Sequence, residues 1–191
     1  MFVTRDEAFT LRAAAKPHRH FAHVAGWGKL RYNGGMALEI STCTQQDYKQ
    51  ILMVLQDFWD GRDISALHHP MLVNEFGNTA FVIRAGPKVI AYLFGFVSQV
   101  EPVGYVHLIA VRPSARRQCL GRELFRHFVE FARGHSCRYV KAVTTPSNLN
   151  SIAFHKSLGM ELLGEPNPAG IPIIPDYAGF NEARVVFWKP I

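Results

Sequence analysis

Regular alternation of apolar and polar residues begins after the first 35 residues of this 191-residue chain. The first part shows little sustained periodicity and closes on RYNGG, a group of residues typical of a turn. We therefore predict an N-terminal extension over residues 1–35 and one domain over residues 36–191. With 48% apolar residues, the chain is long enough to build a core of its own.

The periodicity of apolar residues, and the Gly and Pro residues that interrupt it, predict the helices and strands of the domain. Strands are expected at 37–43, 79–84, 88–100, 105–113, 138–145 and 184–190. Helices are expected at 45–59, 64–76, 118–135 and 147–159. Apolar residues share one face of the third helix at Leu120, Leu124, Phe128 and Phe131.

We expect the order β α α β β β α β α β β, in which one of the seven strands is not assigned a residue range, and this order predicts a single α/β (α+β) domain. A mixed, mostly antiparallel sheet of about six to seven strands would be flanked by about four helices. One parallel crossover would join the strand that ends near residue 113 to the strand that begins near residue 138.

The formal net charge of +6 raises the question of a nucleic-acid partner. Residues 1–35 carry six Lys or Arg against two acidic residues, a net +4, which leaves +2 for the rest. Within the domain, residues 112–141 hold eight Lys or Arg against two Glu. Such a local basic zone fits a compact anionic ligand better than a nucleic acid, which favours basic residues interleaved with stacking aromatics.

Several other classes of protein do not fit the sequence. No apolar run reaches the ~18 to 20 residues of a membrane span, and the start lacks a secretory signal pattern. Cys43, Cys119 and Cys137 form no C-x-x-C pair, which argues against a disulfide framework and a zinc site. The cluster of His18, His20 and His23 could bind a metal ion, but no carboxylate or cysteine lies nearby to complete a metal site. We expect a cytoplasmic protein without a metal cofactor or a membrane partner.

The stretch VRPSARRQCLGRELF, residues 111–125, joins a predicted strand to a predicted helix through a basic loop. The first N–H groups of a helix have no partner within the helix, and the helix dipole favours an anion there. Arg116, Arg117 and Arg122 add positive charge around these groups. The loop is therefore predicted to bind phosphate.

Two motifs resemble those of the GNAT superfamily of acetyl-CoA-dependent N-acetyltransferases. The run RRQCLG, residues 116–121, resembles the family's R/Q-x-x-G-x-G/A loop, with Cys119 where the first glycine usually stands. The run NLNSIAFHKSLGM resembles the N-x-x-A/S-x-x-F/L-Y/H-x-x-x-G-F/M helix motif, at Asn148, Ser151, Phe154, His155, Gly159 and Met160. The resemblance covers about residues 37–190, and the two motifs in the expected order are more specific than either alone.

The resemblance implies acetyl-CoA as cosubstrate and an amine as acceptor, with no metal. The coenzyme would contact the end of the fourth strand, the basic loop and the later helix, at Ile109, Ala110, Val111, Arg116, Arg117, Gln118, Cys119, Leu120, Gly121, Arg122, Asn148, Ser151 and His155. Backbone N–H groups near residues 109–111 would stabilise the oxyanion, because that strand parts from its neighbour there.

His155 stands where many family members carry a tyrosine that protonates the leaving thiolate. Either a neutral imidazole N–H or an imidazolium could donate that proton. The alternative is that His155 only packs, or interacts with the end of its helix.

His107 is the candidate general base, because an amine acceptor must lose a proton and the fourth strand carries no carboxylate. Some family members carry a histidine at this position. Alternation predicts that His107 shares a strand face with Tyr105, Ile109 and Val111; a purely structural histidine is the alternative. Polar loop residues could instead recognise the amine or be ordinary surface residues: Asp60, Asp63, His68, His69, Asp176 and Tyr177.

Two other functions stay open from the sequence. The chain could be a non-catalytic acyl-CoA-binding module of the same fold, which Cys119 and the missing tyrosine permit. A basic nucleic-acid-binding protein is the weaker alternative. A homodimer is compatible with the sequence, and the acceptor is not readable because acceptor pockets lie in variable loops.

Overall fold

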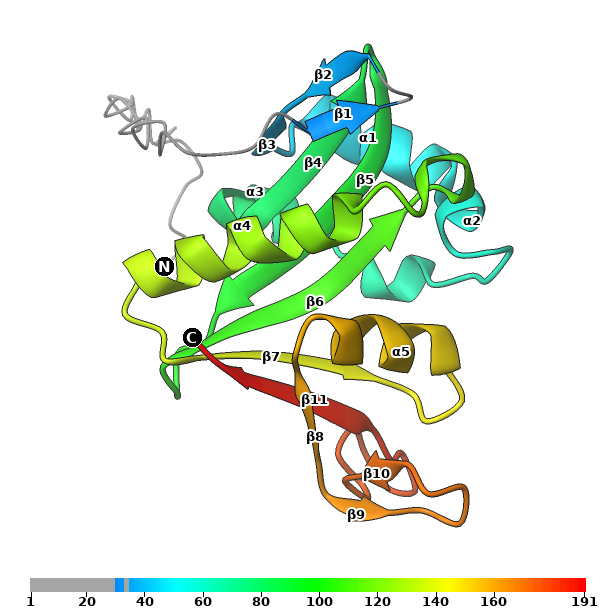
Figure 1. The fold of residues 1–191 in the computed structure, drawn as a ribbon, viewed down its shortest axis with the longest axis vertical. Helices are drawn as coiled ribbons and strands as arrows, with labels where there is room; N and C mark the ends of the chain where they lie inside the picture. Colours follow the sequence, from blue (N-terminus) through cyan, green and yellow to red (C-terminus); the bar gives the residue numbers. More distant parts are fainter. Residues whose placement is uncertain (1–29, 33–34) are drawn as a thin grey trace, which may run out of the picture.

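A seven-stranded sheet forms the centre of the molecule in a computed structural model that describes residues 30–32 and 35–191 (Figure 1). Its strands, in spatial order, are β3 (Ile40–Thr42), β4 (Ala80–Ala85), β5 (Lys88–Val97), β6 (Val103–Val111), β7 (Tyr139–Thr144), β11 (Val185–Pro190) and β8 (Glu161–Leu163). Within these strands only β6 and β7 run parallel. The predicted mixed, mostly antiparallel fold is confirmed.

Two small antiparallel pairs lie outside this sheet: β1 (Leu30–Tyr32) with β2 (Met36–Leu38), and β9 (Glu165–Pro166) with β10 (Pro172–Ile173). The first pair crosses the boundary predicted at residue 35, because β1 precedes it and β2 follows it. The cluster of His18, His20 and His23 lies outside the described residues.

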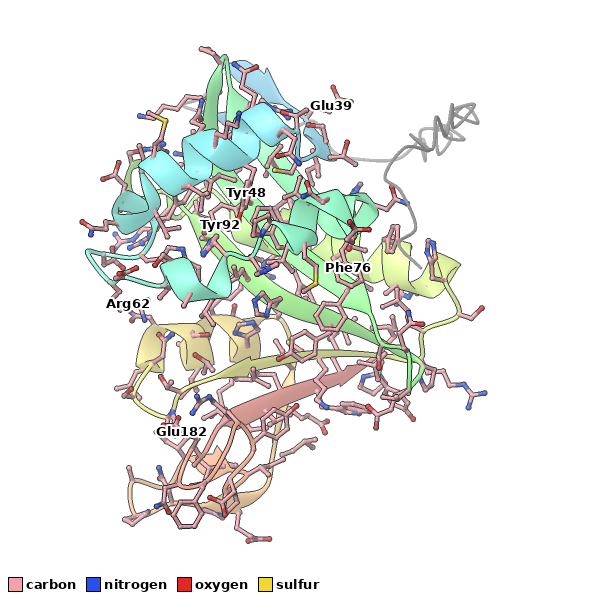
Figure 2. The ribbon with its side chains drawn as sticks, turned by 180° about the vertical axis from the view of Figure 1, so that it is seen from behind. Glu39, Tyr48, Arg62, Phe76, Tyr92 and Glu182 are labelled. Carbon is pink, nitrogen blue, oxygen red and sulfur yellow. The ribbon has the colours of Figure 1, made fainter. Side chains whose placement is uncertain are left out.

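The described residues form five α-helices, which lie on the two faces of the sheet (Figures 1 and 2). One face carries α4 (Leu120–Gly134) and α5 (Leu149–Ser157). The other carries α1 (Gln45–Met53), α2 (Leu55–Phe58) and α3 (Met71–Asn74). Short 3-10 turns occur at η1 (Ser65–Leu67), η2 (Gly77–Thr79) and η3 (Pro113–Ala115). The helix expected over 45–59 is split at Val54, whose φ of −125° leaves the helical range.

Local side chains explain why α1 begins where it does. The Thr44 hydroxyl accepts from the backbone N–H of Asp47 at 3.2 Å, and the Asp47 carboxylate accepts from the Thr44 N–H at 2.8 Å. This reciprocal capping box satisfies two donors that the helix leaves free. Arg84 on β4 also pairs with Asp47, so the same carboxylate fixes the helix to the sheet.

The apolar face of α4 lies directly on two glycines of the sheet. A Cβ at Gly95 on β5 would lie 2.7 Å from the Phe128 ring and 2.6 Å from the Tyr105 carbonyl oxygen. A Cβ at Gly104 on β6 would lie 3.0 Å from the same ring and 2.9 Å from Ala132. Only glycine permits this approach, so the pair sets how closely α4, which carries the basic loop at its start, packs on β5 and β6.

The two parallel strands part early. β6 pairs with β7 over four positions, from Val103 opposite Tyr139 to Val106 opposite Ala142, and Figure 1 shows the strands diverging beyond them. On its other side β6 carries one extra residue, because Phe94 faces Leu108 whereas the next residue of β5 faces Val106. His107 is therefore the bulged residue, and a bulge bends and twists a strand.

The bulge overturns the predicted alternation of β6. Val106 packs in the core cluster under α4, whereas Leu108 packs in the cluster under α1 and α3. Ile109 and Val111 consequently face α4. His107 stays on the opposite face near Tyr105, with ring centroids 6.5 Å apart, so the prediction that it shares a face with Ile109 and Val111 was wrong.

We predict that Gly95→Ala lowers the free energy of unfolding by about 1 to 3 kcal/mol, because the new methyl group overpacks the contact with Phe128. Urea unfolding measures the change. Gly134→Ala is the matched control, since a Cβ there meets no atom within 4 Å and alanine favours a helix. Equal stability of the two variants would contradict the proposed role of Gly95.

Candidate active site

The basic loop between β6 and α4 has the backbone expected of an anion site. Arg117 and Cys119 adopt left-handed conformations, with φ of 63° and 59°. Cys119 is the N-cap of α4, and its side chain makes no capping hydrogen bond. The N–H groups of the first turn therefore have no side-chain cap and can donate to an anion.

Gly121 brings the two sequence motifs into contact. A Cβ at this position would lie 3.2 Å from the Phe154 ring on α5 and 3.5 Å from Val111 Cγ2. The loop motif and the helix motif thus meet at the point where α4 begins, beside the end of β6.

The three arginines of the loop have different surroundings. Arg116 makes a bidentate pair with Asp60, at 2.9 and 3.1 Å, and its Nε donates to the Val111 carbonyl oxygen at 3.2 Å. Arg117 and Arg122 are exposed. Asp60, a candidate for amine recognition, is therefore engaged by the loop, and Arg117 and Arg122 are the more accessible cations.

The backbone N–H groups of β6 point alternately toward β5 and toward the side where β7 no longer pairs with it. The Arg112 N–H donates to the Ile90 carbonyl oxygen on β5 at 2.9 Å, and residues of an antiparallel ladder alternate in direction. The N–H groups of Ile109 and Val111 consequently point away from β5, toward the side that β7 has left. The N–H of Ala110 points to β5, so the alternation leaves two of the three predicted residues as donors.

Asn148 and Ser151 organise the start of α5. The Asn148 side chain accepts from the Ser151 N–H at 3.2 Å, as an N-cap, and donates to the Thr144 hydroxyl at 3.1 Å. This cap fixes the helix that carries His155 to the end of β7.

His155 is buried, with 4% of its surface exposed, and its ring stacks on Phe187 at a centroid distance of 4.3 Å. Nδ1 lies 2.8 Å from the Ser151 carbonyl oxygen and 3.2 Å from the Ser151 hydroxyl, whereas the buried Nε2 has no hydrogen-bond partner among the described residues. Burial lowers the pKa of His155 to about 4, and the bond to the Ser151 carbonyl only partly opposes this. The ring is therefore neutral near pH 7.

His107 lies at the first position of β6 beyond the pairing with β7. Its Nε2 donates to the Leu67 carbonyl oxygen at 3.0 Å, because a carbonyl can only accept. In the neutral ring, Nδ1 then carries the free lone pair. His107 also lines a pocket of about 440 Å³ between η1, α3 and the sheet.

The other polar candidates lie in three different surroundings. His69 lines this pocket with His107, whereas His68 is buried beneath it. Asp63 accepts from the Ser65 N–H at 2.9 Å, and Asp176 accepts from the Asn181 N–H at 2.6 Å, which are ordinary turn contacts. The Lys141 ammonium lies over the Tyr177 ring, 5.5 Å from its centroid.

Sequence reasoning missed the apolar walls of the pocket. Leu67, Met71 and Phe76 all lie in the stretch predicted as one helix over 64–76, which the structure divides into η1, α3 and the segment after α3, and Phe96 comes from β5. Figure 2 shows Phe76 beside the sheet at the edge of the helical layer.

Among the described residues, no group of three or more His, Cys, Asp or Glu side chains could hold a metal ion. In the same part of the chain, every helix is too short or too polar to cross a membrane.

The parting of β6 from β7 and the basic loop at the start of α4 bring the two sequence motifs together at one end of the mixed sheet. The sequence pattern of the Acetyltransferase (GNAT) family matches residues 41–160. The chain belongs to this family.

The chain is similar to a curated L-2,4-diaminobutyric acid acetyltransferase of Shouchella clausii (strain KSM-K16), with 28% identity over 95 residues. That match covers 49% of this chain and 53% of the relative, so the chain spans about half the length of the curated relative.

Solved structures share the fold at low identity. The ribosomal-protein-S18-alanine N-acetyltransferase of Escherichia coli has a TM-score of 0.56 and 20% identity, covering 81% of this chain and 94% of that chain. The diaminobutyrate acetyltransferase of Paenibacillus lautus, in complex with its substrate and coenzyme A, has a TM-score of 0.59 and 17% identity, covering 80% and 95%.

We predict that Cys119→Gly stabilises the chain by about 1 kcal/mol, because glycine removes the cost of a β-carbon in a left-handed conformation. Cys119→Ala keeps the β-carbon and should give no gain. Urea unfolding compares the three chains, and equal stabilities of the Gly and Ala variants would contradict this account of the loop.

We also predict an effect of His155 on acid stability. Between pH 6.5 and pH 4 the unfolded chain binds a proton at this histidine and the folded chain does not, so stability falls as pH drops through that window. His155→Phe should reduce the loss of unfolding free energy between pH 7 and pH 4 by about 3 kcal/mol. Urea unfolding at both pH values measures this, and an unchanged loss would show that His155 is solvated.

Proposed function

We propose that the chain is an N-acetyltransferase that moves an acetyl group from acetyl-CoA to the primary amine of a small molecule or peptide. The amine would attack directly in a ternary complex. The observation that carries the proposal is the parted end of β6: the unpaired N–H groups of Ile109 and Val111 and the histidine at position 107 lie within five residues of one another, beside the basic loop.

The residues present fit the coenzyme. The uncapped first turn of α4 and the exposed Arg117 and Arg122 would hold its phosphates. The buried Nε2 of His155, without a partner in the described chain, is a polar atom that a ligand could satisfy. When bound, acetyl-CoA supplies the acetyl thioester.

His107 is the proposed base. With Nε2 donating to the Leu67 carbonyl oxygen, its Nδ1 can accept a proton from the acceptor ammonium and leave a neutral amine. The N–H groups of Ile109 and Val111 would stabilise negative charge on the carbonyl oxygen during attack.

His155 is the proposed donor to the thiolate, in its neutral form. An imidazolium donor does not fit, because its pKa of about 4 leaves almost no protonated ring near pH 7. Donation from Nε2 requires the proton on that atom, and the Ser151 hydroxyl, 3.2 Å from Nδ1, can support this tautomer by donating to Nδ1. The bond from Nδ1 to the Ser151 carbonyl supports the opposite tautomer, which favours the alternative of an acyl-CoA-binding module without catalysis.

Single-turnover acetyl transfer, with calorimetric coenzyme A binding alongside, tests the proposal. Gly121→Glu should abolish coenzyme binding, because it places bulk against Phe154 and a negative charge in the loop. His107→Gln and His155→Phe should bind coenzyme A normally and transfer about a hundredfold more slowly, the scale of general acid–base catalysis. No acetylated chain should accumulate in mass spectra before amine is added.

Met53→Ser, on the exposed side of α1, is the control and should match the natural chain. Coenzyme binding without transfer to any amine would favour the binding module. Absence of coenzyme binding at millimolar concentration would overturn the proposal.

A further inference from the structure

An apolar pocket adjoins the proposed base. Six of its lining residues are Leu67 from η1, His69 and Met71 at α3, Phe76 after α3, Phe96 from β5 and His107 from β6. Its volume of about 440 Å³ lies in the range of sites for small ligands.

The pocket shares His107 with the proposed catalytic site, so a ligand in the pocket would lie beside the proposed base. Because the bulge keeps this histidine on the face of Tyr105, the ring faces α3 and η1 rather than α4. The basic loop lies on α4, so an acceptor in this pocket and a coenzyme on the loop would approach the parted strands from opposite faces of the sheet.

The walls favour an apolar ligand. Phe76 and Phe96 have ring centroids 5.6 Å apart, and Phe96 stacks on Tyr105 at 4.9 Å, so aromatic surface lines the sheet side. Leu67 and Met71 at the rim are 47% and 44% exposed, which leaves apolar surface that a ligand could remove from water.

The walls also disfavour a second charge. No Asp or Glu occurs among the described residues that line the pocket, and its polar side chains are the two histidines. A second ammonium group would have no anionic partner there, and burial of an unpaired charge is unfavourable.

We infer that the acceptor is a monoamine that carries an aryl or branched-alkyl group, with that group in the pocket and the amine at His107. This inference rests on the proposed function and gives its substrate class. It separates this chain from the similar diaminobutyrate acetyltransferases, whose substrate carries two amines and a carboxylate.

The experiment measures kcat/KM of the full chain with acetyl-CoA for three amines: phenylethylamine, ethylamine and L-2,4-diaminobutyric acid. Phenylethylamine should exceed each of the others by about thirtyfold or more, the scale on which an apolar pocket discriminates. Met71→Ser should raise KM for phenylethylamine about fivefold and raise KM for ethylamine by a smaller factor, because ethylamine carries no aryl group to contact the pocket wall. Met53→Ser, 84% exposed on α1 and outside the pocket, is the matched control and should change neither.

Calorimetric binding of phenylethylamine to the coenzyme-saturated chain separates the two hypotheses. Binding that Met71→Ser weakens, without turnover, would support the pocket and overturn the proposed function. Turnover with diaminobutyrate preferred, or with phenylethylamine and ethylamine equal, would overturn the pocket inference alone. If phenylethylamine neither binds nor is acetylated, the pocket inference is likewise overturned.

Discussion

The parting of β6 from β7 is the constraint on which the site depends. Pairing ends after Val106, and the extra residue on β6 lies at the next position, His107. Because a bulge bends its strand and increases its twist, the bulge accounts for the divergence at this point. The N–H groups of Ile109 and Val111 point toward the side that β7 has left, and their side chains pack under α4, while His107 stays on the face of Tyr105.

The connection after α2 links the two halves of the site. At its start Asp60 pairs with Arg116 of the basic loop, and near its end the Leu67 carbonyl oxygen accepts from His107. The next residue, buried His68, accepts from the Tyr92 hydroxyl at 2.8 Å while its Nδ1 donates to the Ile64 carbonyl oxygen at 3.1 Å. Burial lowers the pKa of His68, which keeps this ring a neutral acceptor. Separate polar contacts along this one connection thus place the pocket wall relative to the basic loop.

Sequence patterns predicted the positions of six of the seven strands of the main sheet and the sheet type, because periodicity and turn residues are local signals. The bulge left no such signal. Both faces of β6 are buried under helices, so the residues after His107 are apolar whichever face they point to. A shift of one residue in the alternation between the two faces therefore leaves the sequence of apolar residues unchanged. The pairing of Arg116 with Asp60 was equally invisible, since it joins positions 56 apart in the chain. The proposed acceptor pocket was missed because Phe96 and His107 meet its other walls only in the folded chain.

The departure from tyrosine at position 155 changes the chemistry that α5 can offer. A buried phenol is a neutral donor at pH 7, whereas a buried imidazole must choose which nitrogen holds its one proton. The two Ser151 oxygens near Nδ1 favour opposite tautomers. The carbonyl oxygen can only accept, which favours the proton on Nδ1, whereas the hydroxyl can donate to Nδ1, which favours the proton on Nε2. Because the His155 ring stacks on Phe187, its plane is fixed. The two tautomers therefore differ in which nitrogen holds the proton and not in the orientation of the ring. If His155 is the proton donor that we propose, its donation from Nε2 requires the Ser151 hydroxyl to donate to Nδ1, which would give the serine of the helix motif a chemical role beyond its place on the helix.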